Sequence, residues 1–150
     1  MKNLSFRELS ALGSALAVIF SAYAYFPDAL WLSAAFSAGT TQGLERTDLV
    51  KFALGMVLLL IVIEVVYHVI LAILMRSEAH EPADERDRLI GMKAVRIGYG
   101  VIVTGIVLLA GYLLTVDISG LVAVQYLLLV LFIGEGVRYA SQFLLYRLGI

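Results

Sequence analysis

Four long apolar segments dominate the sequence and limit the folds that it can adopt. Hydrophobic residues make up 61% of the 150 residues and charged residues only 15%, with a mean hydropathy of +0.94. A soluble domain has about 45–50% apolar and about 25% charged residues, and a helix needs about 20 apolar residues to cross a bilayer. The sequence therefore predicts an all-α polytopic membrane protein, a four-transmembrane-helix bundle forming a single domain over residues 1–150. The predicted spans cover residues 9–26, 49–75, 94–116 and 121–145.

The first segment stops before Pro27, whose ring disfavours the interior of a helix. A basic start and the small-x-small pattern Ala22-Tyr23-Ala24 also fit a cleaved secretory signal, but three further apolar segments favour a retained anchor. In the loop that follows, Leu30, Trp31 and Ala34 predict one face of a short interfacial helix with the tryptophan at headgroup depth.

Basic residues predict the orientation, because lysine and arginine near span ends are retained in the cytoplasm. They gather in the two terminal regions and between the second and third spans. These residues are Lys2, Arg7, Arg76, Arg86, Arg88, Lys93, Arg96 and Arg147. On the opposite side, Arg46 and Lys51 are offset by Glu45 and Asp48, and the turn 117–120 has no basic residue. We therefore expect an N-in/C-in topology with residues 76–93 as a cytoplasmic loop.

Several ionisable side chains lie inside the predicted spans, where a charge costs about 2.5–3.5 kcal/mol at the centre of the bilayer. Glu64 and Glu135 should lie about 21–23 Å below the outer ends of the second and fourth spans, which run in the same direction. His68 and Arg138 follow one turn deeper on the same helix faces. We expect these four side chains to form one cluster. The candidate ligand- or ion-binding residues are Glu64, Tyr67, His68, Arg96, Glu135 and Arg138.

Three interpretations of this cluster remain open from the sequence. The cluster is purely architectural, or it binds or conducts a cation, a proton or a small polar ligand in transport or sensing, or it is a metal site. Glu64, His68 and Glu135 would be the metal ligands, although one histidine is few for metal catalysis. We predict no catalytic residue and no cofactor. The chain has no cysteine, which excludes thiolate chemistry, and it has no basic stripe for a nucleic acid.

The loop between the second and third spans is rich in charge. Pro82, with acidic residues after it, predicts a helix that begins near residue 82 and continues into the third span. Asp84 and Glu85 can each pair with Arg88 along its surface. An alternative function follows, in which a structural or regulatory membrane protein uses this helix to dock a cytoplasmic protein partner. The docking candidates are Asp84, Glu85, Asp87 and Arg88.

The string Asp84-Glu85-Arg86-Asp87-Arg88-Leu89-Ile90, followed by Lys93-Ala94, resembles the cytoplasmic loop of a group of small prokaryotic integral membrane proteins. Those proteins have four predicted spans and no assigned function. Many end in a Tyr-Arg-Arg-Gly-type tail, which Tyr146-Arg147-Leu148-Gly149 matches in part. The resemblance implies the four-span topology and the cytoplasmic (inner) membrane of a prokaryote, and it implies no activity.

Small residues recur along the first and third spans, where they let helix backbones approach closely. They are Ala11, Gly13, Ser14, Ala15, Ala17, Ser21 and Ala22 in the first span, and Ala94, Gly98, Gly100, Gly105, Ala110 and Gly111 in the third. We expect the tight contacts on these two helices. The same small faces could pair two subunits, which favours a homodimer.

Overall fold

The computed structural model describes residues 4–37 and 46–149, and this part of the chain is helical with no strand. Its elements are α1 (Phe6–Ser37), α2 (Arg46–Leu74), the short α3 (Arg76–Ala79), α4 (Glu85–Leu113) and α5 (Gly120–Leu148). By length and composition, 4 helices can cross a membrane, with apolar stretches at Phe6–Asp28, Ala53–Leu74, Glu85–Leu113 and Gly120–Leu148. The prediction of an all-α fold with four such helices is confirmed.

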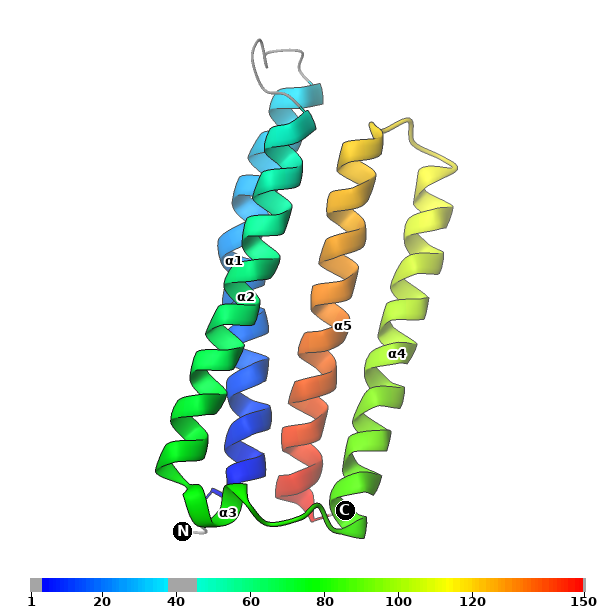
Figure 1. The fold of residues 1–150 in the computed structure, drawn as a ribbon. Helices are drawn as coiled ribbons and strands as arrows, with labels where there is room; N and C mark the ends of the chain where they lie inside the picture. Colours follow the sequence, from blue (N-terminus) through cyan, green and yellow to red (C-terminus); the bar gives the residue numbers. More distant parts are fainter. Residues whose placement is uncertain (1–3, 38–45, 150) are drawn as a thin grey trace.

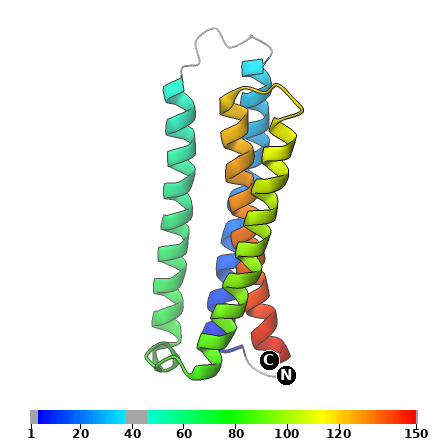
Figure 2. The same cartoon turned by 90° about the vertical axis from the view of Figure 1, so that its right-hand side faces the viewer.

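The four long helices run roughly along one axis, with α3 and both chain ends at the same end of the molecule (Figure 1). In space their order is α2, α1, α5, α4, because α1 packs against α2 and α5, and α5 packs against α1 and α4. Figure 2 shows α2 standing apart from α4, although α3 and a short connection join them in sequence. The bundle is therefore an open arc with α2 and α4 at its two edges.

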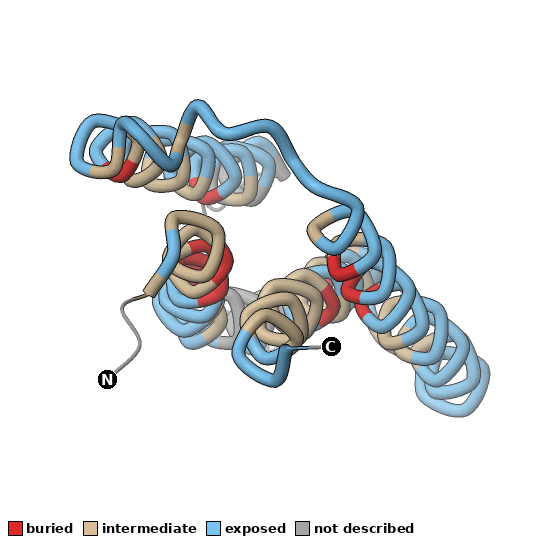
Figure 3. Tube along the Cα trace, turned by 90° about the horizontal axis from the view of Figure 1, so that it is seen from below, coloured by how far each residue is buried: buried red, intermediate tan, exposed pale blue. Residues whose placement is uncertain are grey.

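The buried core lies along the small residues of α1, which is one of the two inner helices of the arc (Figure 3). In an apolar window of 18 residues within α1, 39% of the residues are buried, against 6% in the corresponding window of α2. The buried positions include Ala11, Ser14, Ala15, Val18 and Ser21, which recur on one helical face. Because α2 packs mainly against α1, most of its valine, leucine and isoleucine side chains point outwards.

Glycines bring α4 and α5 together. A Cβ atom on Gly98 would lie 2.6 Å from the Cβ of Arg138 and 3.0 Å from the carbonyl oxygen of Gly134, so the two backbones approach closely there. One on Gly105 would lie 2.6 Å from a methyl carbon of Val130. The first and third spans do carry tight contacts, as their small residues predict. However, α1 and α4 do not make these contacts with each other. Both pack against α5, and Gly13 of α1 also contacts α2.

Some predicted boundaries were wrong. Pro27 does not end the first helix but lies inside α1, which continues past Trp31 and Ala34, so the predicted interfacial helix is part of α1. Neighbouring groups and water can satisfy the one carbonyl that a proline leaves without a donor. At the other end of the molecule, the helix predicted from Pro82 begins at Glu85. Residues 38–45 of the predicted outer loop lie outside the described residues.

Side-chain caps fix where α4 and α5 begin. Asp84 is the N-cap of α4 and shares a capping box with Asp87, in which each side chain accepts a hydrogen bond from the backbone N–H of the other. These bonds satisfy N–H groups that a helix start leaves without partners. Ser119 caps α5 in the same way, by accepting a hydrogen bond from the N–H of Val122. The turn between Leu113 and Gly120 therefore closes the α4–α5 hairpin.

Candidate functional site

Glu64 of α2 and Glu135 of α5 line the same cavity, between these two helices and against Val18 of α1. The cavity has a volume of about 470 Å³, which lies in the range of about 300–1,000 Å³ typical of small-molecule sites. Glu64 lies near the middle of the apolar stretch Ala53–Leu74, and Glu135 near the middle of Gly120–Leu148. The two carboxylates are therefore brought together at mid-helix, far from either end of the molecule.

Arg138 neutralises one of these carboxylates. Its Nη1 donates a hydrogen bond to Oε2 of Glu135 at 2.8 Å, across one turn of α5. The guanidinium carbon lies 4.9 Å from the centre of the Tyr139 ring, within cation–π range, and the Cβ atom packs on Gly98. The Nε–H is buried without a hydrogen-bond acceptor among the described residues. The ion-pair partner of Arg138 is therefore Glu135, and its other contacts are with Tyr139 of α5 and Gly98 of α4.

Glu64 has a different environment. No described residue forms an ion pair or a hydrogen bond with its carboxylate, whereas its backbone carbonyl accepts a hydrogen bond from Nδ1 of His68 at 2.8 Å. Eleven residues line the cavity, and the eight apolar ones provide no counter-charge for the Glu64 carboxylate. The cavity therefore holds two carboxylates, of which one is paired with an arginine.

Tyr139 joins the three helices at this point. It lines the cavity with both glutamates, and its hydroxyl lies near the side chain of Ser14 of α1, which is only 2% exposed. Tyr139 and Ser14 were not among the residues predicted for the site. The signal was present for Tyr139, which lies four residues after Glu135 and therefore on the same helix face.

His68 and Tyr67 contact α1 rather than the cavity, so the expected four-residue cluster is divided. Nε2 of His68 lies 2.8 Å from the hydroxyl of Ser10, and the Tyr67 hydroxyl donates to the carbonyl of Leu9 at 2.6 Å. The Tyr67 ring also packs against Gly13. These two side chains hold α2 against α1. Sequence spacing placed them one turn from Glu64 but could not define on which side of α2 each would point.

Two further predictions concern the metal ligands and Arg96. No group of three or more histidine, aspartate or glutamate side chains in residues 4–37 and 46–149 could hold a metal ion. Glu64 and Glu135 share the cavity, but His68 does not line it. Arg96 is exposed on α4 and does not line the cavity either. The structure thus places Glu64, Glu135 and Tyr139 at the cavity, with Arg138 attached through Glu135.

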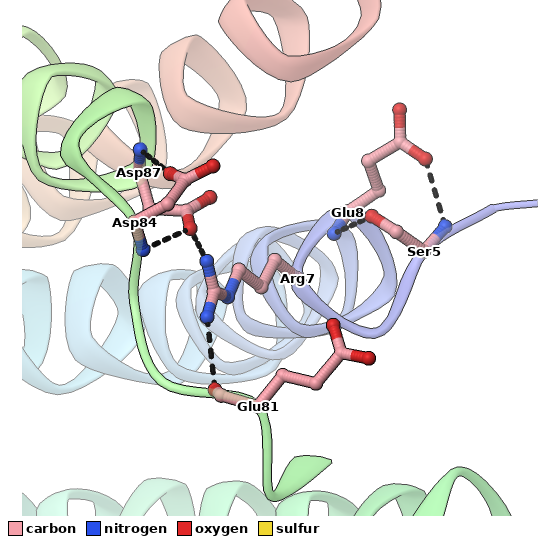
Figure 4. Close-up of polar contacts among 6 residues, drawn as sticks. All are labelled: Ser5, Arg7, Glu8, Glu81, Asp84 and Asp87. Carbon is pink, nitrogen blue, oxygen red and sulfur yellow. Dashed lines mark hydrogen bonds and ion pairs between the residues drawn. The ribbon is translucent and has the colours of Figure 1, made fainter. Parts of the chain in front are cut away.

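The charged loop binds the start of the chain's own first helix (Figure 4). Arg7 forms an ion pair with Asp87 and donates a hydrogen bond to the carbonyl of Glu81 at 3.1 Å. The N–H of Phe6 donates to Oε2 of Glu78 at 2.9 Å, which satisfies one of the first amides of α1. We name these contacts the N-terminal strap.

The strap changes the reading of the predicted docking residues. Asp84 caps α4, and the Asp87 side chain, 13% exposed, holds Arg7. Glu85 and Arg88 are exposed. Asp84 and Arg88 interact only through the backbone, where the N–H of Arg88 donates a hydrogen bond to the carbonyl oxygen of Asp84 at 3.2 Å. Two of the four residues are therefore used within the chain itself.

Comparison of the chain with protein-family models, with curated proteins and with solved structures found no match. The likeness of its charged loop to that of small four-span prokaryotic proteins therefore stays an expectation from the sequence.

Proposed function

We propose that this chain is an integral membrane protein that binds a cation between α2 and α5, with the carboxylate of Glu64 as the anchor. The observation that carries this proposal is the unequal pairing in the cavity. Arg138 compensates Glu135, while Glu64 has no charged partner among the described residues. A carboxylate at mid-span is costly in lipid unless it meets a counter-charge. A bound cation supplies this counter-charge.

The membrane location and topology form part of the proposal. The 4 apolar helices support a multi-pass protein, and the exposed aliphatic side chains of α2 suit contact with lipid. α3 and the start of α4 lie at the end that holds both termini (Figure 1), and these segments carry Arg76, Arg86, Arg88 and Lys93. By the positive-inside rule this end faces the cytoplasm. The inner membrane of a prokaryote is the location that the resemblance of the charged loop implies.

The absence of cysteine from the sequence gives a direct test of this topology. Single cysteines at Ser77 in α3 and at Thr115 in the α4–α5 turn occupy exposed positions at opposite ends of the molecule. A membrane-impermeant maleimide should label Thr115→Cys in intact cells and Ser77→Cys only after permeabilisation. The opposite labelling pattern would reverse the assigned orientation.

Cation binding is tested by thermal unfolding of the purified protein in detergent, at constant ionic strength, with sodium, potassium, ammonium or an organic cation added. Ligand at a hundred times its Kd stabilises a protein by about 2.7 kcal/mol. We expect such stabilisation in the unmodified chain and in Glu85→Gln, a matched control that removes an exposed carboxylate at the start of α4. We expect its loss in Glu64→Gln.

The competing interpretation is that the polar groups are purely architectural and fix the packing of the helices. In that case Glu64→Gln and the control would respond equally to every cation, and Glu64→Gln would change only the basal stability. That result would remove the binding proposal.

A further inference from the structure

The walls of the cavity restrict the chemistry of the cation. Eight of the eleven lining residues are apolar, and the polar ones are Glu64, Glu135 and Tyr139. An inorganic cation such as Ca²⁺ takes 6–8 oxygen ligands, and Mg²⁺ keeps several of its waters. The cavity offers few oxygens, and one of its carboxylates already binds Arg138. An organic cation that carries its own hydrocarbon needs only one carboxylate and an apolar wall.

The position of the opening restricts the route of entry. Val57, Ile61 and Val65 of α2 and Leu131 of α5 line the cavity and are 39%, 51%, 55% and 40% exposed, so they form its rim on the outer surface. They belong to the apolar stretches of their helices and not to the helix ends. The cavity therefore opens sideways, towards the hydrocarbon of a surrounding bilayer. A ligand that enters there must first dissolve in the bilayer.

The two restrictions define one class of ligand. We infer that the cavity takes an amphiphilic organic cation, such as an ammonium or phosphonium with large apolar substituents, that enters between α2 and α5 from the bilayer. Its charge lies against Glu64, and its apolar groups lie against Ile61, Leu131 and Phe132. This inference rests on the proposed function, because it specifies the cation that the same carboxylate anchors. The complementary charge of Glu64 distinguishes this occupant from a neutral lipid chain.

The test uses tetraphenylphosphonium as the probe and measures its equilibrium binding to the full chain in nanodiscs of a neutral lipid. Triphenylphosphine oxide serves as a neutral probe of related shape, and potassium as an inorganic cation. We expect saturable binding of the phosphonium alone. Glu64→Gln should weaken it about ten- to hundredfold, as expected for loss of the Coulombic attraction between a carboxylate and a phosphonium in a low-dielectric site. Glu85→Gln should leave it unchanged.

A second variant tests the apolar wall and remains informative if Glu64→Gln fails to fold. Ile61→Asn places an amide on the exposed rim without touching either carboxylate, and it should weaken phosphonium binding several-fold. Stabilisation by potassium that requires Glu64, without phosphonium binding, would overturn this inference and leave the proposed function standing. Equal binding of both phosphorus probes, unaffected by Glu64→Gln, would show a groove for neutral lipid and overturn it too. Absence of any cation effect would overturn both proposals.

Discussion

Replacing Gly98 by alanine perturbs the closest approach of α4 to α5. The added Cβ atom would lie 2.6 Å from the Arg138 Cβ, 3.0 Å from the Gly134 carbonyl oxygen and 3.3 Å from the Arg138 Cα. Two of these three neighbours are backbone atoms, which cannot rotate away, so the two helices must separate. Overpacking of this kind costs about 1–3 kcal/mol.

The same helix provides a matched control. Gly100 is exposed, and a Cβ atom there meets nothing within 4 Å. Alanine has a higher helix propensity than glycine by about 0.5–1 kcal/mol, and this gain applies to both positions. The difference in unfolding free energy between Gly98→Ala and Gly100→Ala therefore isolates the contact, and we expect it to be about 1–3 kcal/mol.

An intermediate variant gives the order of the effects. At Gly105 the three atoms nearest to the added Cβ all belong to the side chain of Val130, the closest at 2.6 Å, and a side chain can change its rotamer. The expected order of stability is Gly100→Ala, then Gly105→Ala, then Gly98→Ala. Denaturation in mixed micelles, followed by far-UV circular dichroism, measures all three. Equal stability of Gly98→Ala and Gly100→Ala would refute the reasoning, because it would mean that the α4–α5 backbones are not in close contact.

Three further outcomes are expected. In a double-mutant cycle, Glu135→Gln and Arg138→Gln should couple by about 0.5–3 kcal/mol in unfolding free energy, and additive effects would contradict their 2.8 Å ion pair. Arg7→Gln should lower the free energy of unfolding by no more than about 1 kcal/mol, yet it should speed amide hydrogen exchange at the start of α1. The control Arg88→Gln, at an exposed position, should not speed this exchange, and equal exchange in both variants would argue against the strap. Tyr67→Phe should cost about 1 kcal/mol in thermal unfolding, through loss of its hydrogen bond to α1, and an unchanged midpoint would show that this bond contributes nothing.

Much of the fold could be predicted from the sequence. A long apolar segment in a bilayer must satisfy its backbone hydrogen bonds within the protein, and a helix does so within the segment itself. Counting residues along two helices of the same direction also placed Glu64 and Glu135 at similar depth, and the structure brings both to one cavity. Depth along a helix depends only on the rise per residue. It is therefore available without any knowledge of tertiary contacts.

The rotation and lateral order of the helices could not be predicted in this way. Apolar residues lie on every side of α2, so its sequence does not indicate which face meets α1. For this reason His68 was expected beside Glu135, whereas in the structure it contacts Ser10. The strap between Arg7 and Asp87 joins residues far apart in sequence, whereas the local charge pattern predicted Asp87 as a docking residue for a partner. Pro27 shows the limit of a local rule, since α1 continues through it.

The placement of α1 between α2 and α5 has a consequence for biosynthesis. The main packing partner of α1 is α5, which the ribosome synthesises after α2 and α4. Until α5 is inserted, the side chain of Ser14 has no Tyr139 beside it, and the face of α1 that carries Ala15 and Val18 stays uncovered on the side of α5. A nascent chain halted after α4 would therefore present this face of small residues, with the Ser14 hydroxyl, to lipids or to an insertase. Quality-control proteases could distinguish such a chain from the finished one by the accessibility of α1 alone.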